Sequence, residues 1–198
     1  AKSVSSLSEV FKEPIGSAVQ VPGLILNAGA ESFTSRCYAQ QQDRATGTCI
    51  ILSSGAAPLK GTMVTVTGKV GRIDGERVLL DAYLQPTGVP GEPAALGLSG
   101  RALTSANLST QGLLVEIWGT VSHVAPDRSF FTVDDGSGLT DGMGHPGIRV
   151  VCDGNLQQIA PPAQGAVVTV KGISGCENDG SLPVIRPRLQ SDIIVILH

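Results

Sequence analysis

The chain has 198 residues, of which 41% are hydrophobic, 16% are charged and 4% are aromatic, and its formal net charge is −3. With 25 glycines and 12 prolines, this composition excludes a coiled coil or a helical bundle, and the hydrophobic fraction excludes an intrinsically disordered chain. The acidic balance without a basic block argues against a dedicated nucleic-acid-binding protein, and no apolar run reaches the length needed to span a membrane.

The start of the chain is a short polar segment followed by a helix signal. Residue 1 is alanine rather than methionine, so we interpret the chain as an exported protein that has lost its signal peptide, or as a fragment of a larger protein. Residues 6–12 predict a short helix, with Ser6 as its N-cap and Glu9 completing a capping box.

Short strand signals follow, each separated from the next by turn residues. Apolar and polar residues alternate with a period of two, most clearly over residues 63–70, and the turn Asp74-Gly75 precedes the last strand of this half. The predicted strands cover residues 19–25, 33–40, 48–52, 63–70 and 77–84.

A proline- and glycine-rich segment then divides the chain. We predict a first domain over residues 1–87, a linker over 88–111 and a second domain over 112–198. Residues 94–103 are apolar enough to pack on a domain, so we expect a covered linker and a fixed pair of domains. Asn107 begins an Asn-Leu-Ser glycosylation acceptor pattern.

The second half repeats the first. Residues 115–121 match residues 19–25, and residues 165–172 match residues 61–68. The offset between the halves grows along the chain because residues 134–147 form a glycine-rich loop without a counterpart. Two β-rich units of roughly 85–90 residues fit the size of small domains.

Five strands per unit, with glycine inside the first and fourth strands, suggest a small closed barrel. At this point the sequence resembles the oligonucleotide/oligosaccharide-binding (OB) fold, and in particular the tandem pairs of such domains in large exported bacterial proteins. The residues that carry the resemblance are 112–121, 130–138, 147–151 and 172–177, with 74–78 in the first half. The resemblance implies an all-β protein of two tandem five-stranded Greek-key OB-like barrels, and it implies no catalytic residues, since this fold hosts many activities.

The four cysteines are either paired or buried as free thiols. None lies in a Cys-x-x-Cys pair, which argues against structural zinc. In the fold that the sequence resembles, Cys37 lies on the second strand and Cys49 on the third, so we expect them to pair; the pairing of Cys152 with Cys176 stays open. Disulfides would indicate export from the cell.

The sequence shows no catalytic constellation, and we expect neither an enzyme nor a cofactor. No serine lies in a nucleophile frame and no phosphate-binding loop opens a helix. In the 134–147 loop, Asp134, Asp135 and Asp141 are a weak candidate calcium site, because the spacing departs from the calcium-loop pattern. A long turn with solvated acids is the favoured interpretation.

Ligand-binding candidates are few. Barrels of this fold bind through aromatic side chains and a basic groove, and oligosaccharide needs less positive charge than nucleic acid, which we consider an improbable ligand. The candidate residues are Tyr38, Tyr83, Trp118, Arg186 and Arg188.

The end of the chain, Ile193, Ile194, Val195, Ile196 and Leu197, is an unbroken apolar strand. Such a strand is either the last strand of the barrel, buried on both faces, or an edge that adds to another copy and gives head-to-tail assembly. The leading hypothesis is a secreted, non-catalytic structural or adhesive protein that assembles from copies of itself, with oligosaccharide binding as the alternative.

Overall fold

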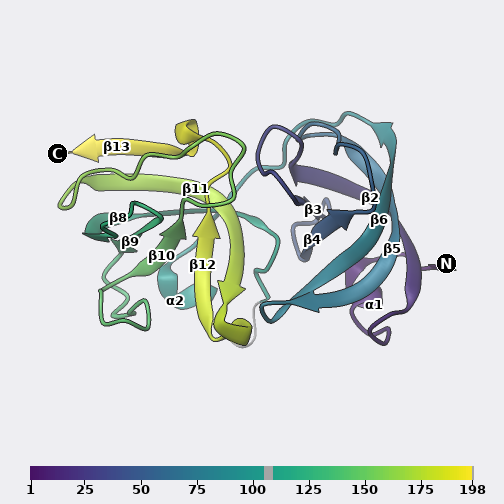
Figure 1. Cartoon of the computed structure of the whole chain (residues 1–198), viewed down its shortest axis with the longest axis horizontal. Helices are drawn as coiled ribbons and strands as arrows, with labels where there is room; N and C mark the ends of the chain where they lie inside the picture. The colour runs from purple at the N-terminus through teal and green to yellow at the C-terminus, as the bar shows by residue number, and fades with distance from the viewer. Residues whose placement is uncertain (105–108, 198) are drawn as a thin grey trace.

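The computed structural model describes residues 1–104 and 109–197. It contains two β-barrel units arranged along the long axis, with the N-terminus at one end and the C-terminus at the other (Figure 1). The predicted glycosylation pattern at Asn107 lies outside the described residues. Neither helix in the described ranges is long and apolar enough to cross a membrane.

The first unit is a closed ring of five strands. Its elements are β1 (Lys2–Ser3), α1 (Leu7–Val10), β2 (Ala18–Ala28), β3 (Cys37–Gln40), β4 (Gly47–Leu52), β5 (Met63–Ile73) and β6 (Glu76–Gly88). The ring runs β2-β3-β4-β6-β5 and closes through a β2–β5 pairing, with β4 and β6 parallel and β1 added alongside β2.

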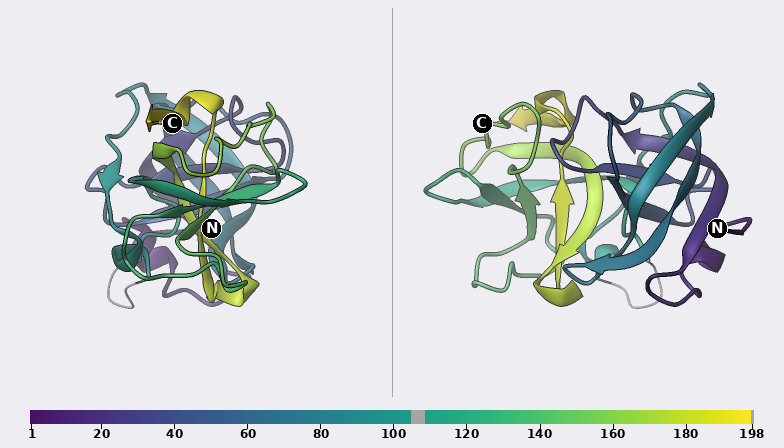
Figure 2. Two further views of the ribbon diagram at one scale, coloured as in Figure 1. Left: turned by 90° about the vertical axis from the view of Figure 1, so that its left-hand side faces the viewer. Right: turned by 45° about the vertical axis from the view of Figure 1, so that its right-hand side comes forward.

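The second unit repeats this topology. Its elements are β7 (Leu96–Gly97), α2 (Gly100–Leu103), β8 (Leu114–Val124), β9 (Phe130–Asp134), β10 (Ile148–Val151), β11 (Val167–Glu177), β12 (Leu182–Arg186) and β13 (Ile193–Leu197). The ring β8-β9-β10-β12-β11 closes through β8–β11, again with one parallel pair, β10 and β12. The predicted all-β fold of two five-stranded barrels is therefore confirmed, and Figure 2 shows the two units from further directions.

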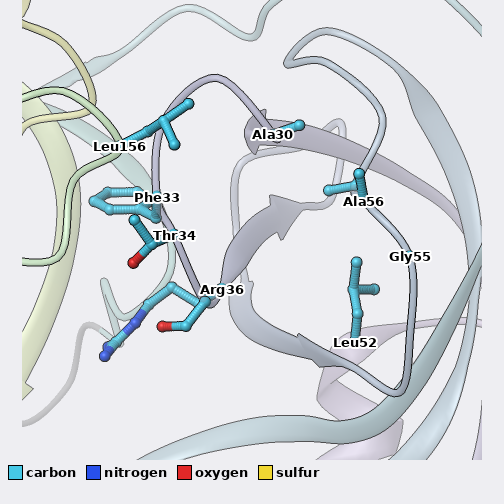
Figure 3. A pocket seen from close by; sticks show the side chains of 10 residues that line it. Ala30, Phe33, Thr34, Arg36, Leu52, Gly55, Ala56 and Leu156 are labelled. Atoms are coloured by element: carbon cyan, nitrogen blue, oxygen red, sulfur yellow. The ribbon is translucent and has the colours of Figure 1, made fainter.

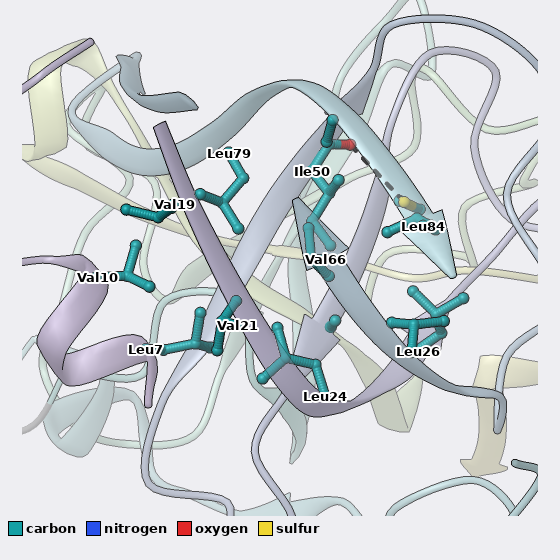
Figure 4. Packing of buried hydrophobic residues seen from close by; sticks show 14 of the residues in the cluster. Leu7, Val10, Val19, Val21, Leu24, Leu26, Ile50, Val66, Leu79 and Leu84 are labelled. Carbon is teal, nitrogen blue, oxygen red and sulfur yellow. Dashed lines mark hydrogen bonds between the residues drawn. The ribbon is translucent and has the colours of Figure 1, made fainter. Parts of the chain in front are cut away.

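Each barrel is filled by the inward-facing residues of its alternating strands. Along β5, Val64, Val66 and Val70 are buried while Thr65 and Lys69 point outward. Helix α1 closes one end of the first barrel with Leu7 and Val10 (Figure 4). It is shorter than predicted, but Ser6 does cap it, accepting a hydrogen bond from the Glu9 amide.

The predicted linker is partly built into the second unit. β7 pairs with β8 in parallel, as β1 does with β2, and α2 follows β7 as α1 follows β1. Leu103 lies in the core of the second barrel and Leu96 packs against that core. The second unit therefore begins before residue 112, and its first segment repeats the N-terminal segment of the chain.

The last strand differs between the units. β6 is continuous and pairs with β5 over its whole length, from Ile73↔Glu76 to Met63↔Gly88. In the second unit, β12 pairs with the second half of β11 and β13 pairs with its first half. β13 is thus the continuation of the last barrel strand, and the intervening residues 187–192 leave the sheet.

Candidate functional site

The two barrels share an apolar interface. Ala28, Tyr38, Cys49 and Val78 of the first unit, with Phe33, form one buried cluster with two residues of the second unit, Leu114 and Ile173. Phe33 packs edge-on against Tyr38, with ring centroids 5.5 Å apart. These side chains lie on the outer face of β2, β3, β4 and β6, so the face that would otherwise meet solvent is closed by the second barrel.

Polar contacts surround this apolar cluster. Glu76 Oε1 accepts from the Cys176 amide at 2.6 Å and from Arg186 Nη1 at 3.0 Å. Asn27 Nδ2 donates to the carbonyl oxygen of Gly112 at 2.8 Å, and Gln40 Oε1 accepts from the Leu114 amide at 2.9 Å. Every one of these bonds joins the two units.

Arg188 makes the most extensive contact between the units. Its guanidinium pairs with Asp192 in its own segment at 2.8 Å and with Glu92 of the linker at 2.5 Å, and Nη1 donates to the carbonyl oxygen of Asn27 at 2.9 Å. Glu92 also pairs with Lys60 of the first unit at 2.9 Å. Residues 187–192 leave the sheet at the place where Arg188 reaches the first barrel.

This arrangement differs from the ligand-binding role expected for Tyr38, Arg186 and Arg188. All three are buried because the other barrel covers them. They hold the two units together and are not accessible to a ligand from solution. Only Tyr83 and Trp118 among the five candidates are exposed, and they lie on different units.

Trp118 borders a shallow pocket on the outside of the second barrel. The pocket has a volume of about 410 Å³ and is lined by Glu116 and Asp135 as well as Leu98 and Thr169. Asp135 Oδ2 already accepts from the Gly100 amide at 2.6 Å. The exposed indole of Trp118 therefore shares this pocket with two carboxylates.

A second pocket lies between the loops that follow β2 and β4 and has a volume of about 330 Å³. Its lining is mainly Phe33, Leu52, small residues and Leu156 of the second unit (Figure 3). The Arg36 side chain points away from the pocket toward the second unit. The polar residues of the lining are Thr34, Ser35 and Arg36.

β13 is an edge strand with exposed apolar side chains. Ile193 is buried in the second core, but Ile194 (58%), Ile196 (55%) and Leu197 (64%) are exposed, and Val195 is exposed to a lesser degree. The strand therefore continues the barrel without being buried on both faces. Ile194 and Trp118 both lie opposite Thr169, on either side of β11, so two exposed apolar side chains flank this threonine on one face of the sheet.

The three acidic residues of the 134–147 loop do not converge. Asp134 Oδ1 accepts from the Gly136 amide and Asp135 caps the start of α2, while Asp141 accepts from the amides of Met143 and His145. In the described ranges no three His, Cys, Asp or Glu side chains are grouped as metal ligands. The carboxylates of Asp134 and Asp141 accept hydrogen bonds from the loop backbone.

Asp141 fastens this loop to the barrel. Its Oδ2 lies 2.9 Å from His145 Nδ1 and 3.4 Å from Arg149 Nη2, and His145 stacks on His123 with ring centroids 3.6 Å apart. Burial raises the pKa of the Asp141 carboxyl, but hydrogen bonds from His145 and from the Met143 amide outweigh this effect and bring the pKa down to about 2.

The Asp141→Asn variant should therefore lose the corresponding acid sensitivity. The pKa of Asp141 is lower in the folded state than its ordinary value of 3.8, so the ionised carboxylate stabilises the folded protein. This stabilisation, about 2 kcal/mol, is present above pH 4 and is lost as the pH falls toward 2. Urea unfolding at several pH values should show a shallower decline for the variant than for the wild type. The control is Asp153→Asn, at an exposed position, which should decline as the wild type does. An equal decline in the Asp141→Asn variant and in the wild type would contradict this role of Asp141.

The cysteines are free thiols in the structure, and all four are buried. The expected Cys37–Cys49 bridge is absent because the register pairs Cys37 with Ile50 and Cys49 with Tyr38. Neighbouring positions point to opposite faces of a sheet, so Cys37 lies in the first core while Cys49 lies at the interface. Burial raises the pKa of Cys37 and Cys152 to about 12 and that of Cys49 and Cys176 to about 11.

Several interface residues carried no signal in the sequence. Asn27, Glu76 and Glu92 are common surface types, and their partners are 85 to 110 residues away. The one signal in the sequence was for Glu76, which directly follows the turn Asp74-Gly75. In comparisons with known proteins, no family model and no curated protein matches the chain.

Proposed function

We propose that this protein is a secreted, non-catalytic structural module that assembles head to tail with copies of itself. The observation that carries the proposal is β13, an edge strand whose outward side chains are uncharged and apolar. Proteins usually protect an edge with charges, proline or a covering segment. The matching end of β6, Gln85-Pro86-Thr87, has such protection, and β13 has none.

The positions of the two ends suit a linear arrangement. β13 lies at one end of the long axis and β1 and α1 lie at the other (Figure 1). A contact between two different surfaces, one at each end, produces a chain of subunits when the rotation between them does not close a ring. The apolar and polar contacts between the barrels would transmit load along such a chain.

Trp118 lies on the same face as Ile194, across Thr169, and enlarges the surface available to a neighbour. Burying an isoleucine side chain contributes about 2 kcal/mol, so two residues of β13 account for a substantial part of a micromolar contact. Along β13 itself the exposed residues Ile194, Val195, Ile196 and Leu197 are contiguous, and contiguous exposed hydrophobic groups are typical of interaction sites.

The test is sedimentation velocity and negative-stain microscopy over a concentration series. We expect the wild type to form elongated oligomers or fibres, and the double variant Ile194→Lys, Ile196→Lys to associate at least about 100-fold more weakly, because two buried apolar contacts are replaced by charges. The matched control is Leu59→Lys, Val89→Lys, which places two lysines at exposed apolar positions outside β13.

Two results would contradict the proposal. One is a wild type that remains monomeric at every concentration, and the other is equal weakening by the control. A monomeric wild type would favour the alternative, an oligosaccharide-binding module that uses the pocket beside Trp118.

A further inference from the structure

The pocket beside Trp118 combines an aromatic face with two carboxylates. Glu116 and Trp118 are two residues apart on β8, so both side chains stand on the outer face of the second barrel, and Asp135 lines the same pocket. The Trp118 side chain is 67% exposed, so most of its indole is open to a ligand. Within the part of the chain that the structure describes, no lysine or arginine lines this pocket.

The negative charge of this pocket is not neutralised by an ion pair. Lys171 lies opposite Glu116 on β11, but among the described residues neither Glu116 nor Asp135 forms an ion pair. Burial raises the pKa of the Asp135 carboxyl, but hydrogen bonds from Ser137 and from the Gly100 amide outweigh this effect and hold the pKa below its ordinary value. Asp135 is therefore a carboxylate at neutral pH.

The same barrel shows elsewhere what such a set of groups binds. The Cζ atom of Arg149 lies 4.1 Å from the centroid of the Phe130 ring. Its Nη2 lies 3.4 Å from Asp141 Oδ2, and its Nη1 lies 3.5 Å from Glu177 Oε2. One aromatic ring and two carboxylates thus surround a guanidinium group there, and the pocket beside Trp118 offers the same two kinds of group to a ligand.

The chemistry of these groups favours a guanidinium group as the ligand. The face of an indole ring attracts cations, and a planar guanidinium can stack on it while it donates hydrogen bonds to a neighbouring carboxylate. An ammonium group is more strongly hydrated, which disfavours it in an open pocket. We propose that the pocket binds a guanidinium group, stacked on Trp118 and paired with Glu116, with Asp135 adding negative charge. This inference does not depend on the proposed assembly.

The experiment uses the fluorescence of Trp118, the only tryptophan of the chain, which therefore reports on this pocket alone. The protein is titrated with N-acetylargininamide at one fixed ionic strength and at a protein concentration below self-association. We expect a saturable change with a dissociation constant in the millimolar range, because one exposed cation–π contact and one exposed ion pair give weak binding. The matched probe, N-acetylcitrullinamide, has nearly the same shape without the charge and should give no saturable change.

Two variants test the part played by Glu116. Glu116→Gln keeps the shape of the side chain and should raise the dissociation constant about fivefold, the effect of losing a well-placed exposed ion pair. Asp153→Asn, at an exposed carboxylate outside the pocket, should bind as the wild type does. The proposal is overturned if both variants bind equally well, if the citrulline compound binds as the arginine compound does, or if only a neutral oligosaccharide binds.

A guanidinium group can belong to a small molecule or to an arginine side chain of another protein. A pentapeptide with one arginine between two pairs of alanines distinguishes these sources. Tighter binding of the peptide than of N-acetylargininamide would indicate a protein, because the surface around the pocket then adds contacts, whereas equal binding would indicate a small molecule. Either result supports the guanidinium site, and the absence of binding by both compounds overturns it.

Discussion

Replacing Arg188 with methionine is expected to lower the free energy of unfolding by about 3–5 kcal/mol, the usual cost of breaking a buried ion pair. The substitution keeps an unbranched side chain of similar length but leaves Asp192 and Glu92 without the guanidinium that both contact. It also removes the donor to the Asn27 carbonyl oxygen, which crosses between the units. Urea unfolding followed by circular dichroism measures the change.

The same variant should also separate the unfolding of the two barrels. With the contact weakened, the second barrel can lose its partner before it unfolds, so a single transition is expected to broaden or split. Arg44→Met is the control, since Arg44 is exposed. A loss of less than 1 kcal/mol with an unchanged single transition would show that Arg188 does not hold the units together.

Replacing Gly47 with alanine is expected to cost about 3 kcal/mol, at the upper end for overpacking. A Cβ atom at Gly47 would lie 2.3 Å from the carbonyl carbon of Gly112 and 2.4 Å from its oxygen. These are backbone atoms of the other barrel, which cannot rotate away as a side chain can, so the barrels must shift apart. For a chain of this size, the melting temperature should fall by about 6–12 °C.

Gly88→Ala is the matched control for this prediction. Gly88 also lies at a strand end, its φ is not positive, and a Cβ there would meet no atom within 4 Å. Alanine at Gly88 is therefore expected to leave the melting temperature nearly unchanged. Similar losses in the two variants would mean that the effect comes from glycine replacement in general and not from the close approach of the barrels.

The two β-rich units could be predicted from the sequence because two independent signals agree, whereas the arrangement of strands within each unit was expected from the resemblance to the OB fold. The period-two alternation of residues 63–70 identifies a half-buried strand, and its recurrence in residues 165–172 identifies a second copy of the same unit. Both signals depend only on local residue types. They therefore identify the strands and the repeat before any contact between the two halves is known.

The contacts between the units could not be predicted in the same way. Arg186 and Arg188 look like a basic surface cluster because the carboxylates that pair with them across the interface, Glu76 and Glu92, lie 110 and 96 residues away. The predicted Cys37–Cys49 disulfide was wrong for a different reason. A shift of one residue in register moves a side chain to the other face of a sheet, and composition does not fix the register.

The 134–147 loop, which Asp141 attaches to the second barrel, covers the face of that barrel that corresponds to the interface face of the first barrel. In the first unit, Tyr38 and Cys49 pair across β3 and β4 and face the neighbouring barrel; in the second unit, Thr132 and Arg149 occupy the corresponding positions. There the loop takes the place of a neighbour, with Asp141 contacting Arg149.

The opposite face is closed as well. Leu114 and Ile173, which the second barrel presents to the first, correspond in the first barrel to Ala18 and Lys69, an exposed pair that suits solvent. As in the terminal repeats of a solenoid, neither outer face can therefore bind a further barrel through the contact that joins the two barrels of this molecule. Assembly of several copies therefore cannot use the interface between the two barrels and requires a second, different contact surface.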